Sequence, residues 1–214
     1  MSQFRPATTQ PQAIEDRSFQ IIAEELGPHP FTTEQFPVVQ RVIHASADFE
    51  LGRSLVFHPD AVAAGITAIQ SGKQIVADVQ MVQAGINKSR LAKYGSDVHV
   101  FISDEDVIAA ARQENTTRAI VAMRKACALY PDAIFAIGNA PTALLELVRL
   151  VQTGRAQPSL IVGVPVGFVS AAESKDLLAA VDIPFITNRG RKGGSPVAVS
   201  IVNALCLLAD REGR

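Results

Sequence analysis

The chain has 214 residues, of which 48% are hydrophobic and 19% charged, and its 20 basic and 21 acidic residues nearly cancel. This composition is typical of one globular domain, and a chain of this length buries a sizeable core without disulfides or structural metals. The net charge of −1 provides no general attraction to nucleic-acid phosphates, so we expect no nucleic-acid partner.

No apolar stretch approaches the roughly 20 residues that cross a bilayer, and the apolar run 160–169 is interrupted by Gly163, Pro165 and Gly167. Residues 1–12 lack the apolar segment of a secretory signal. We therefore expect a cytoplasmic protein without membrane contact, with a poorly ordered end over residues 1–12.

The two cysteines, Cys127 and Cys206, lie far apart in apolar, helix-like stretches, and neither has a second thiol or a histidine at the spacing of a metal site. We interpret both as residues of the core and expect no metal site.

The first half of the chain begins with two helices and then alternates strands with helices. The hydrophobic period predicts a helix over 12–26 and a second one that is capped by Thr32 or Thr33 and runs to His44. Short β-rich runs alternate with helical runs after that. The pattern predicts strands at 55–57, 74–77 and 98–102 and helices at 59–70, at about 80–84, after Ser103 or Asp104, and at 116–129.

The second half repeats strand, turn and helix three times: 133–137 into 141–151, 160–164 into 170–180, and 185–187 into 196–209. Strands that are apolar on both faces belong to a parallel sheet covered by helices. We therefore predict a single α/β domain over 1–214, three-layered (α/β/α) around a mostly parallel sheet, with the N-terminal helices packed on it. Ligands of such sheets bind at the carboxyl ends of the strands, so function is sought in the turns there.

The turn 137–142 places Gly138 after a strand, Asn139 in the turn and Pro141 at the first helical position. The backbone N–H groups of such a helix start are free to bind an anion. A merely well-made turn explains the same residues, and the two interpretations stay equally open.

The turn 188–196 contains three glycines and three cations before a helix start, which favours a carboxylate or phosphate ligand. A flexible basic loop is the alternative. The spacing matches neither the phosphate-binding loop of nucleotide hydrolases nor the dinucleotide-binding glycine pattern.

The turn 163–168 is unusually apolar for a surface connection. It is predicted to contact a large flat ligand or a second subunit, unless the N-terminal helices bury it. The sequence does not separate these possibilities.

His44 lies near the end of an amphipathic helix, on a stripe with Gln40 and Asp48 at four-residue spacing. A helix C-terminus and a neighbouring carboxylate both favour a protonated imidazole, which suits a general acid; a surface or capping histidine is the alternative. No nucleophile–histidine–carboxylate arrangement falls on a strand-to-helix turn. The site therefore suits a polycarboxylate ligand whose reaction requires positioning and a proton.

Six runs of the chain, in order, resemble the precorrin-8X methylmutase family of cobalamin biosynthesis: Ile43–Ala45, Asp78–Val82, Asn115–Arg118, Ala136–Leu144, Gly163–Val169 and Ala171–Lys175. The resemblance extends from Arg17 to Asn203. It implies an isomerase that moves a methyl group on ring C of precorrin-8 or cobalt-precorrin-8 to the adjacent carbon, giving hydrogenobyrinic or cobyrinic acid. The shift is formally a [1,5]-sigmatropic rearrangement without S-adenosylmethionine, and no cofactor is implied.

The resemblance also implies roles for individual residues. The histidine at His44 is expected to protonate, or hydrogen-bond to, the ring C nitrogen, and the substrate is a tetrapyrrole with many carboxylates. Family members are homodimers with the active site near the subunit interface. Substrate contacts are expected from Arg17, Ser18, Arg118, Asn139 and Thr142, and from Asn87 where the family has threonine; the anion-site argument adds Arg191, Gly193, Gly194 and Ser195.

Two other functions compete with this interpretation. A corrinoid carrier would bind the product through the same residues and turn nothing over. A nucleotide-dependent enzyme would use the turn 190–195, and a thermal shift with nucleotides would reveal it.

Overall fold

A six-stranded sheet forms the centre of the protein. The structure is a computed structural model, and it describes residues 10–212. All neighbouring strands pair in parallel except β1, which runs antiparallel to β6. In spatial order the strands are β1 (Leu55–Phe57), β6 (Phe185–Asn188), β5 (Leu160–Gly163), β4 (Ile134–Ile137), β2 (Ile75–Ala77) and β3 (Val98–His99).

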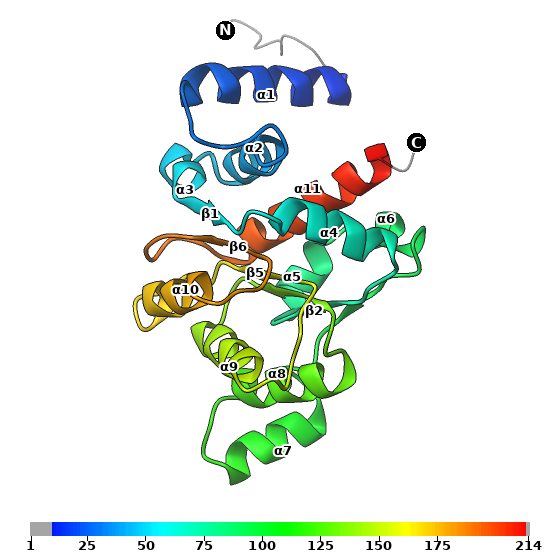
Figure 1. Ribbon diagram of the computed structural model, residues 1–214, viewed down its shortest axis with the longest axis vertical. Helices are drawn as coiled ribbons and strands as arrows, with labels where there is room; N and C mark the ends of the chain where they lie inside the picture. The colour runs from blue at the N-terminus through cyan, green and yellow to red at the C-terminus, as the bar shows by residue number, and fades with distance from the viewer. Residues whose placement is uncertain (1–9, 213–214) are drawn as a thin grey trace, which may run out of the picture.

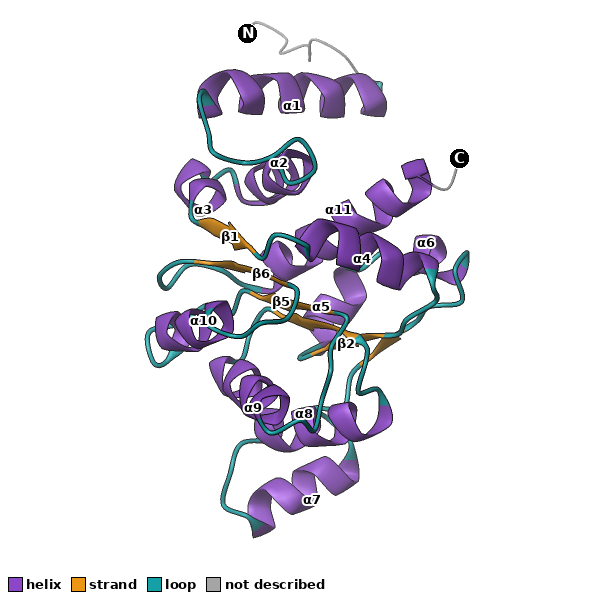
Figure 2. Ribbon diagram, viewed as in Figure 1, coloured by secondary structure: helices purple, strands orange, loops and turns teal. Residues whose placement is uncertain are grey.

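Helices cover both faces of this sheet (Figure 2). One layer contains α4 (Ala61–Gln70), α5 (Gln80–Gly85), α6 (Lys88–Ala92) and α11 (Ser195–Glu212); the other contains α7 (Glu105–Gln113), α8 (Arg118–Leu129), α9 (Pro141–Gln152) and α10 (Ala171–Ala179). Alternate strand residues face the two layers: Ile134 and Ala136 pack with the first, Phe135 and Ile137 with the second. The predicted three-layer α/β fold with a mostly parallel sheet is confirmed.

The N-terminal helices α1 (Pro11–Leu26), α2 (Phe36–Ser46) and α3 (Phe49–Arg53) join the layer of α11. Helix α2 packs against α11 and α1 packs against α2, so α1 is the outermost helix at the top of Figure 1. Pro11 and Gln12, expected in a poorly ordered end, belong to α1; residues 1–9 lie outside the described residues.

Three elements differ from those predicted. Helices α3 and α6 have five residues each, too few for a hydrophobic period, and the side chains of Asp48 and Asn87 cap them. Strand β3 ends at His99 rather than at residue 102, because its neighbour β2 ends at Ala77. Within residues 10–212, no helix has the length and apolar character that crossing a membrane requires.

Candidate active site

The loops that follow the parallel strands lie at one end of the sheet, and those after β5 and β6 project at the left of Figure 1. Two backbone hydrogen bonds join these two loops: Gly194 N donates to Val164 O (2.9 Å) and Gly167 N donates to Arg191 O (3.2 Å). The turn after β4 passes so close to the start of α11 that a Cβ at Gly138 would lie 2.7 Å from Ser195 Cα. The predicted turns therefore form one continuous surface.

His44 lies in the last turn of α2, is exposed, and meets the edge of the Phe19 ring at 5.4 Å between ring centroids. The residues that follow it, Ala45 and Ser46, line a cavity of about 350 Å³. The other wall of this cavity is formed by the loops after β5 and β6, through Val166, Lys192, Gly193, Pro196 and Val197. The end of α2 and the carboxyl ends of the strands thus share one cavity, and His44 directly precedes its lining residues Ala45 and Ser46 without lining it itself.

Asp48 does not continue the helical stripe of His44, contrary to the expectation from its spacing. Ala47 adopts a left-handed conformation (φ 52°) and ends α2. Asp48 instead caps α3 and accepts a hydrogen bond from Lys192 Nζ (2.6 Å). The Lys192 ammonium, with the backbone N–H of Leu51, lowers the pKa of Asp48. The Asp48 carboxylate is therefore paired with Lys192 of the loop after β6.

Asp78, at the end of β2, is a residue that the sequence analysis missed. Its buried carboxylate accepts the backbone N–H groups of Gly138 (3.2 Å), Asn139 (2.8 Å) and Ala140 (2.8 Å). Burial raises the pKa of Asp78, and the three N–H donors act against that rise. A carboxylate of the protein itself therefore occupies the anion position of this turn, so of the two interpretations left open for it, the one in which these three N–H groups are free for a ligand is contradicted.

The loop after β6 also differs from a free basic loop. Lys192 is paired with Asp48 and with Glu50 (2.9 Å), and the Gly194 N–H is occupied by Val164. Arg191 stays exposed, with its guanidinium carbon 5.8 Å from the centre of the Phe168 ring. Ser195 is buried as the first residue of α11. Of the three cations of this loop, Arg189 and Arg191 are therefore exposed and form no ion pair among the described residues, and Arg191 is the one predicted to bind the ligand.

The outer part of the apolar loop after β5, residues 166–169, is not buried under the N-terminal helices, whereas Val164 and Pro165 are buried. Val166 is 46% exposed, Phe168 87% and Val169 82%. Exposed apolar side chains on a loop held by backbone hydrogen bonds are typical of a contact surface. A flat ligand and a second subunit remain the two interpretations.

The other predicted site residues lie at the starts of α8 and α9 and on α1. Thr142 Oγ1 lies 3.3 Å from Thr117 Oγ1, at the start of α8. The exposed side chain of Arg118, the first residue of α8, forms no hydrogen bond or ion pair within residues 10–212. Exposed Asn139 precedes Thr142. Arg17 and Ser18 belong to α1, next to the Phe19 that touches His44.

Asn87 is not joined to His44 by any contact of the described residues. Its side chain caps α6 and its N–H donates to Asn203 Oδ1 (2.9 Å) on α11. Asn203 follows Ser195 by eight residues, which is about 12 Å along a helix.

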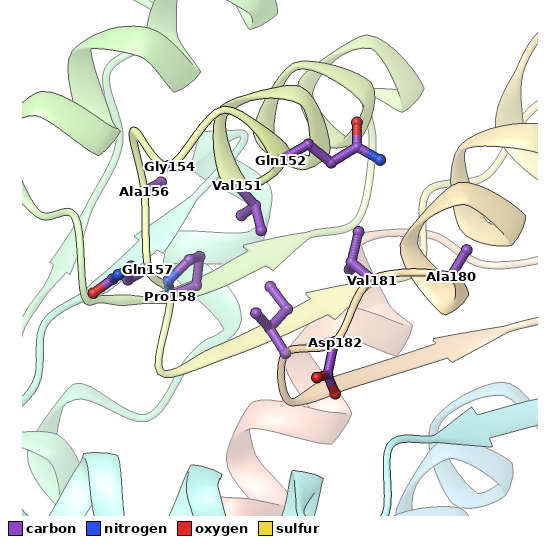
Figure 3. A pocket seen from close by; sticks show the side chains of 10 residues that line it. Val151, Gln152, Gly154, Ala156, Gln157, Pro158, Ala180, Val181 and Asp182 are labelled. Carbon is purple, nitrogen blue, oxygen red and sulfur yellow. The ribbon is translucent and has the colours of Figure 1, made fainter.

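Two alternatives to this site are unsuitable for catalysis. Burial raises the pKa of Cys127 and of Cys206 to about 12, so both thiols are inert residues of the core, as predicted. A cavity of about 580 Å³ lies at the opposite end of the sheet, between the ends of α9 and α10 (Figure 3). Asp182 is the titratable residue of its lining.

Comparison with known proteins shows the family of the chain. The precorrin-8X methylmutase family model matches residues 13–208. The cobalt-precorrin-8 methylmutase of Priestia megaterium is 65% identical over 98% of this chain and 93% of its own length. The Leptospira interrogans cobalt-precorrin-8 methylmutase is 48% identical over 98% and 99%.

A solved structure has the same fold. The precorrin-8x methyl mutase of Thermus thermophilus superposes with a TM-score of 0.88 at 43% identity, covering 94% of this chain and 98% of that one. The chain belongs to the precorrin-8X methylmutase family and is an isomerase of cobalamin biosynthesis.

Proposed function

We propose that this isomerase moves a methyl group on ring C of cobalt-precorrin-8 to the adjacent ring carbon, with His44 as the proton donor. The methyl leaves one carbon and bonds to its neighbour, and the proton that His44 lends to the macrocycle returns to His44, so the product is an isomer of the substrate. The observation that carries the proposal is the exposed His44 in the last turn of α2, directly before the residues that line the cavity shared by α2 and the loops after β5 and β6. An acid of this kind contributes about 10²–10⁴-fold to a rate.

The cobalt form is the preferred substrate in this proposal. The two relatives described above, at 65% and 48% identity, are both named cobalt-precorrin-8 methylmutases. Cobalt enters as part of the substrate, and we propose no resident cofactor or metal.

The exposed arginines are proposed to bind the peripheral carboxylates of the macrocycle, since a guanidinium pairs with a carboxylate through two parallel hydrogen bonds. Among the described residues, the side chains of Arg118 and Arg191 form no ion pair, and Arg17 contacts Gln20 (3.4 Å) and Glu24 (3.9 Å) of its own helix. Asn139, Thr142 and Ser18 supply further polar groups. Gly193 lines the cavity wall, whereas Gly194 and Ser195 are buried directly behind it in the chain, and Asn87 contributes only if the macrocycle extends along α11.

The apolar loop after β5 supports the further proposal that two copies assemble as a homodimer of single-domain subunits in the cytoplasm, each completing the other's site. Sedimentation velocity tests the assembly. The wild type and Leu129→Asp, which alters an exposed leucine at the end of α8, are expected to be dimers, and Phe168→Asp a monomer. A monomeric wild type would contradict the dimer.

The isomerisation is tested by mixing the purified protein with cobalt-precorrin-8, and separately with metal-free precorrin-8, while following the visible spectrum. We expect conversion to the corrin chromophore, faster with the cobalt form. Binding of the product without conversion of either precursor would support a carrier instead.

A further inference from the structure

Lys175, on α10, is a buried cation without a carboxylate partner. Its side chain is 1% exposed, and burial lowers its pKa to about 8. The ion pairs of the described residues include Lys73, Lys93, Lys125 and Lys192, all more exposed, but not Lys175. Burial of an ammonium without a carboxylate costs free energy. Stabilisation of the fold therefore does not account for a lysine at this position.

The Lys175 ammonium donates to the loop that follows β6. It lies 2.7 Å from Lys192 O and 3.3 Å from Asn188 Oδ1. The Asn188 amide donates to the same Lys192 carbonyl (2.8 Å) and to Arg189 O (3.1 Å). The side chains of Lys175 and Asn188 thus form a connected hydrogen-bond network that holds the backbone of the loop at Lys192.

The loop after β6 is also hydrogen-bonded to the loop after β5. Gly194 N and Gly167 N form the two hydrogen bonds that join them, and a Cβ at Gly193 would collide with the Val164 carbonyl oxygen. The Lys192 side chain continues this connection by pairing with Asp48 and Glu50, just beyond the end of α2. A shift of the Lys192 backbone would therefore move both walls of the cavity beside His44.

We propose that Lys175 is a positioning residue, whose hydrogen bonds to the Lys192 carbonyl and the Asn188 side chain hold the loop after β6 in the shape that binds the macrocycle. This inference rests on the proposed function for the identity of the ligand. The part of it that concerns the shape of the loop does not depend on that function. Lys175 does not touch the substrate; it acts through Arg191, Gly193 and the Lys192–Asp48 pair.

The test compares Lys175→Met, which keeps the length of the side chain but removes its donors, with Lys175→Arg, which keeps charge and donors. Lys73→Met is the matched control, because Lys73 pairs with Asp132 before β2 and β4, at the opposite end of the sheet. Two quantities are measured in each protein: the Kd for cobyrinic acid by visible titration, and amide hydrogen exchange. Neither requires turnover.

For Lys175→Met we expect a Kd at least tenfold higher than that of the wild type, and at least tenfold faster exchange at the Gly167 and Gly194 amides. The Val164 amide, which donates to Ile137 O (2.9 Å) between β5 and β4, should stay within twofold. The expected kinetic signature is a larger rise in KM than fall in kcat. Lys175→Arg should recover most of both losses, and Lys73→Met should match the wild type.

Unchanged exchange at Gly167 and Gly194, or unchanged product affinity, in Lys175→Met would overturn the proposal. So would equal acceleration at Val164, since that would mean a general loosening of the fold, or a failure of arginine to restore either quantity. If the wild type neither converts precorrin-8 nor binds its product, the proposed function fails, while the exchange data still decide whether Lys175 holds the loop.

Discussion

At the scale of single residues, His44 carries a reactive imidazole that makes few contacts with the rest of the fold. Its ring is exposed and touches Phe19, and the two residues that follow it in α2 line the cavity. His44→Ala should therefore abolish isomerisation while leaving the melting temperature and product affinity nearly unchanged.

The visible assay and a thermal melt check this prediction. His58→Ala serves as the control for loss of an imidazole outside the site, because His58 lies beyond β1 and contacts Phe185. A His44→Ala enzyme that isomerises at the wild-type rate would eliminate the acid role.

Asp78 has the opposite character, since it is buried and satisfies three backbone donors. Asp78→Ala leaves these N–H groups without an acceptor, and each unsatisfied buried group costs about 1–3 kcal/mol. We expect a loss of at least about 2 kcal/mol in the free energy of unfolding, measured in urea.

The vacated position should then accept a small anion. Formate should raise the urea midpoint of Asp78→Ala but not of the wild type, because only the variant has free N–H donors at the start of α9. An equal effect of formate on both proteins would mean that the carboxylate does not act as the anion of this turn.

At the scale of elements, the two loops beside the cavity depend on the absence of a side chain at Gly193. Its φ of 152° is rarely adopted by other residues, and a Cβ would meet the Val164 carbonyl. Gly193→Ala should separate the loops, lower the stability by about 1–3 kcal/mol and weaken product binding at least tenfold.

Gly190 is the matched control on the same loop. It also has a positive φ (77°), but a Cβ there would meet nothing within 4 Å. Gly190→Ala should cost only about 1 kcal/mol, the usual penalty of the left-handed conformation, and leave product binding unchanged. Equal losses in both variants, by calorimetry and titration, would rule out the close approach as the cause.

The elements themselves were largely predictable from the sequence, whereas the contacts between them were not. Apolar runs between turn residues located β4, β5 and β6, and the proline at the first helical position, Pro141, located the start of α9. Nothing in the sequence marks Ala47 as left-handed. The four-residue spacing of His44 and Asp48 therefore wrongly predicted that both lie on one helical stripe.

The partner of Asp78 lies about 60 residues away, and their contact depends on the pairing of β2 with β4, which the chain order does not reveal. An aspartate directly after a buried strand was the available signal. The family resemblance, in contrast, depends on short local runs of sequence. These runs can be matched without knowing the order of the strands in the sheet.

At the scale of the whole molecule, Lys175 makes the stability depend on pH in a direction that can be worked out. The unfolded chain keeps the proton of this lysine up to its ordinary pKa of 10.5, whereas the folded protein releases it near 8. Between these values the unfolded state binds more protons, so the folded state gains stability as the pH rises.

Lys175→Met lacks this group but keeps the other titrating residues. The free energy of unfolding of the wild type, relative to that of Lys175→Met, should therefore increase between pH 8 and pH 10.5. The shift corresponds to an increase on the order of 3 kcal/mol, at about 1.4 kcal/mol per pKa unit. Urea unfolding of both proteins at several pH values measures it. A constant difference would show that the folded protein holds this ammonium as readily as water does, and the free-energy cost that we assign to its burial would then be absent.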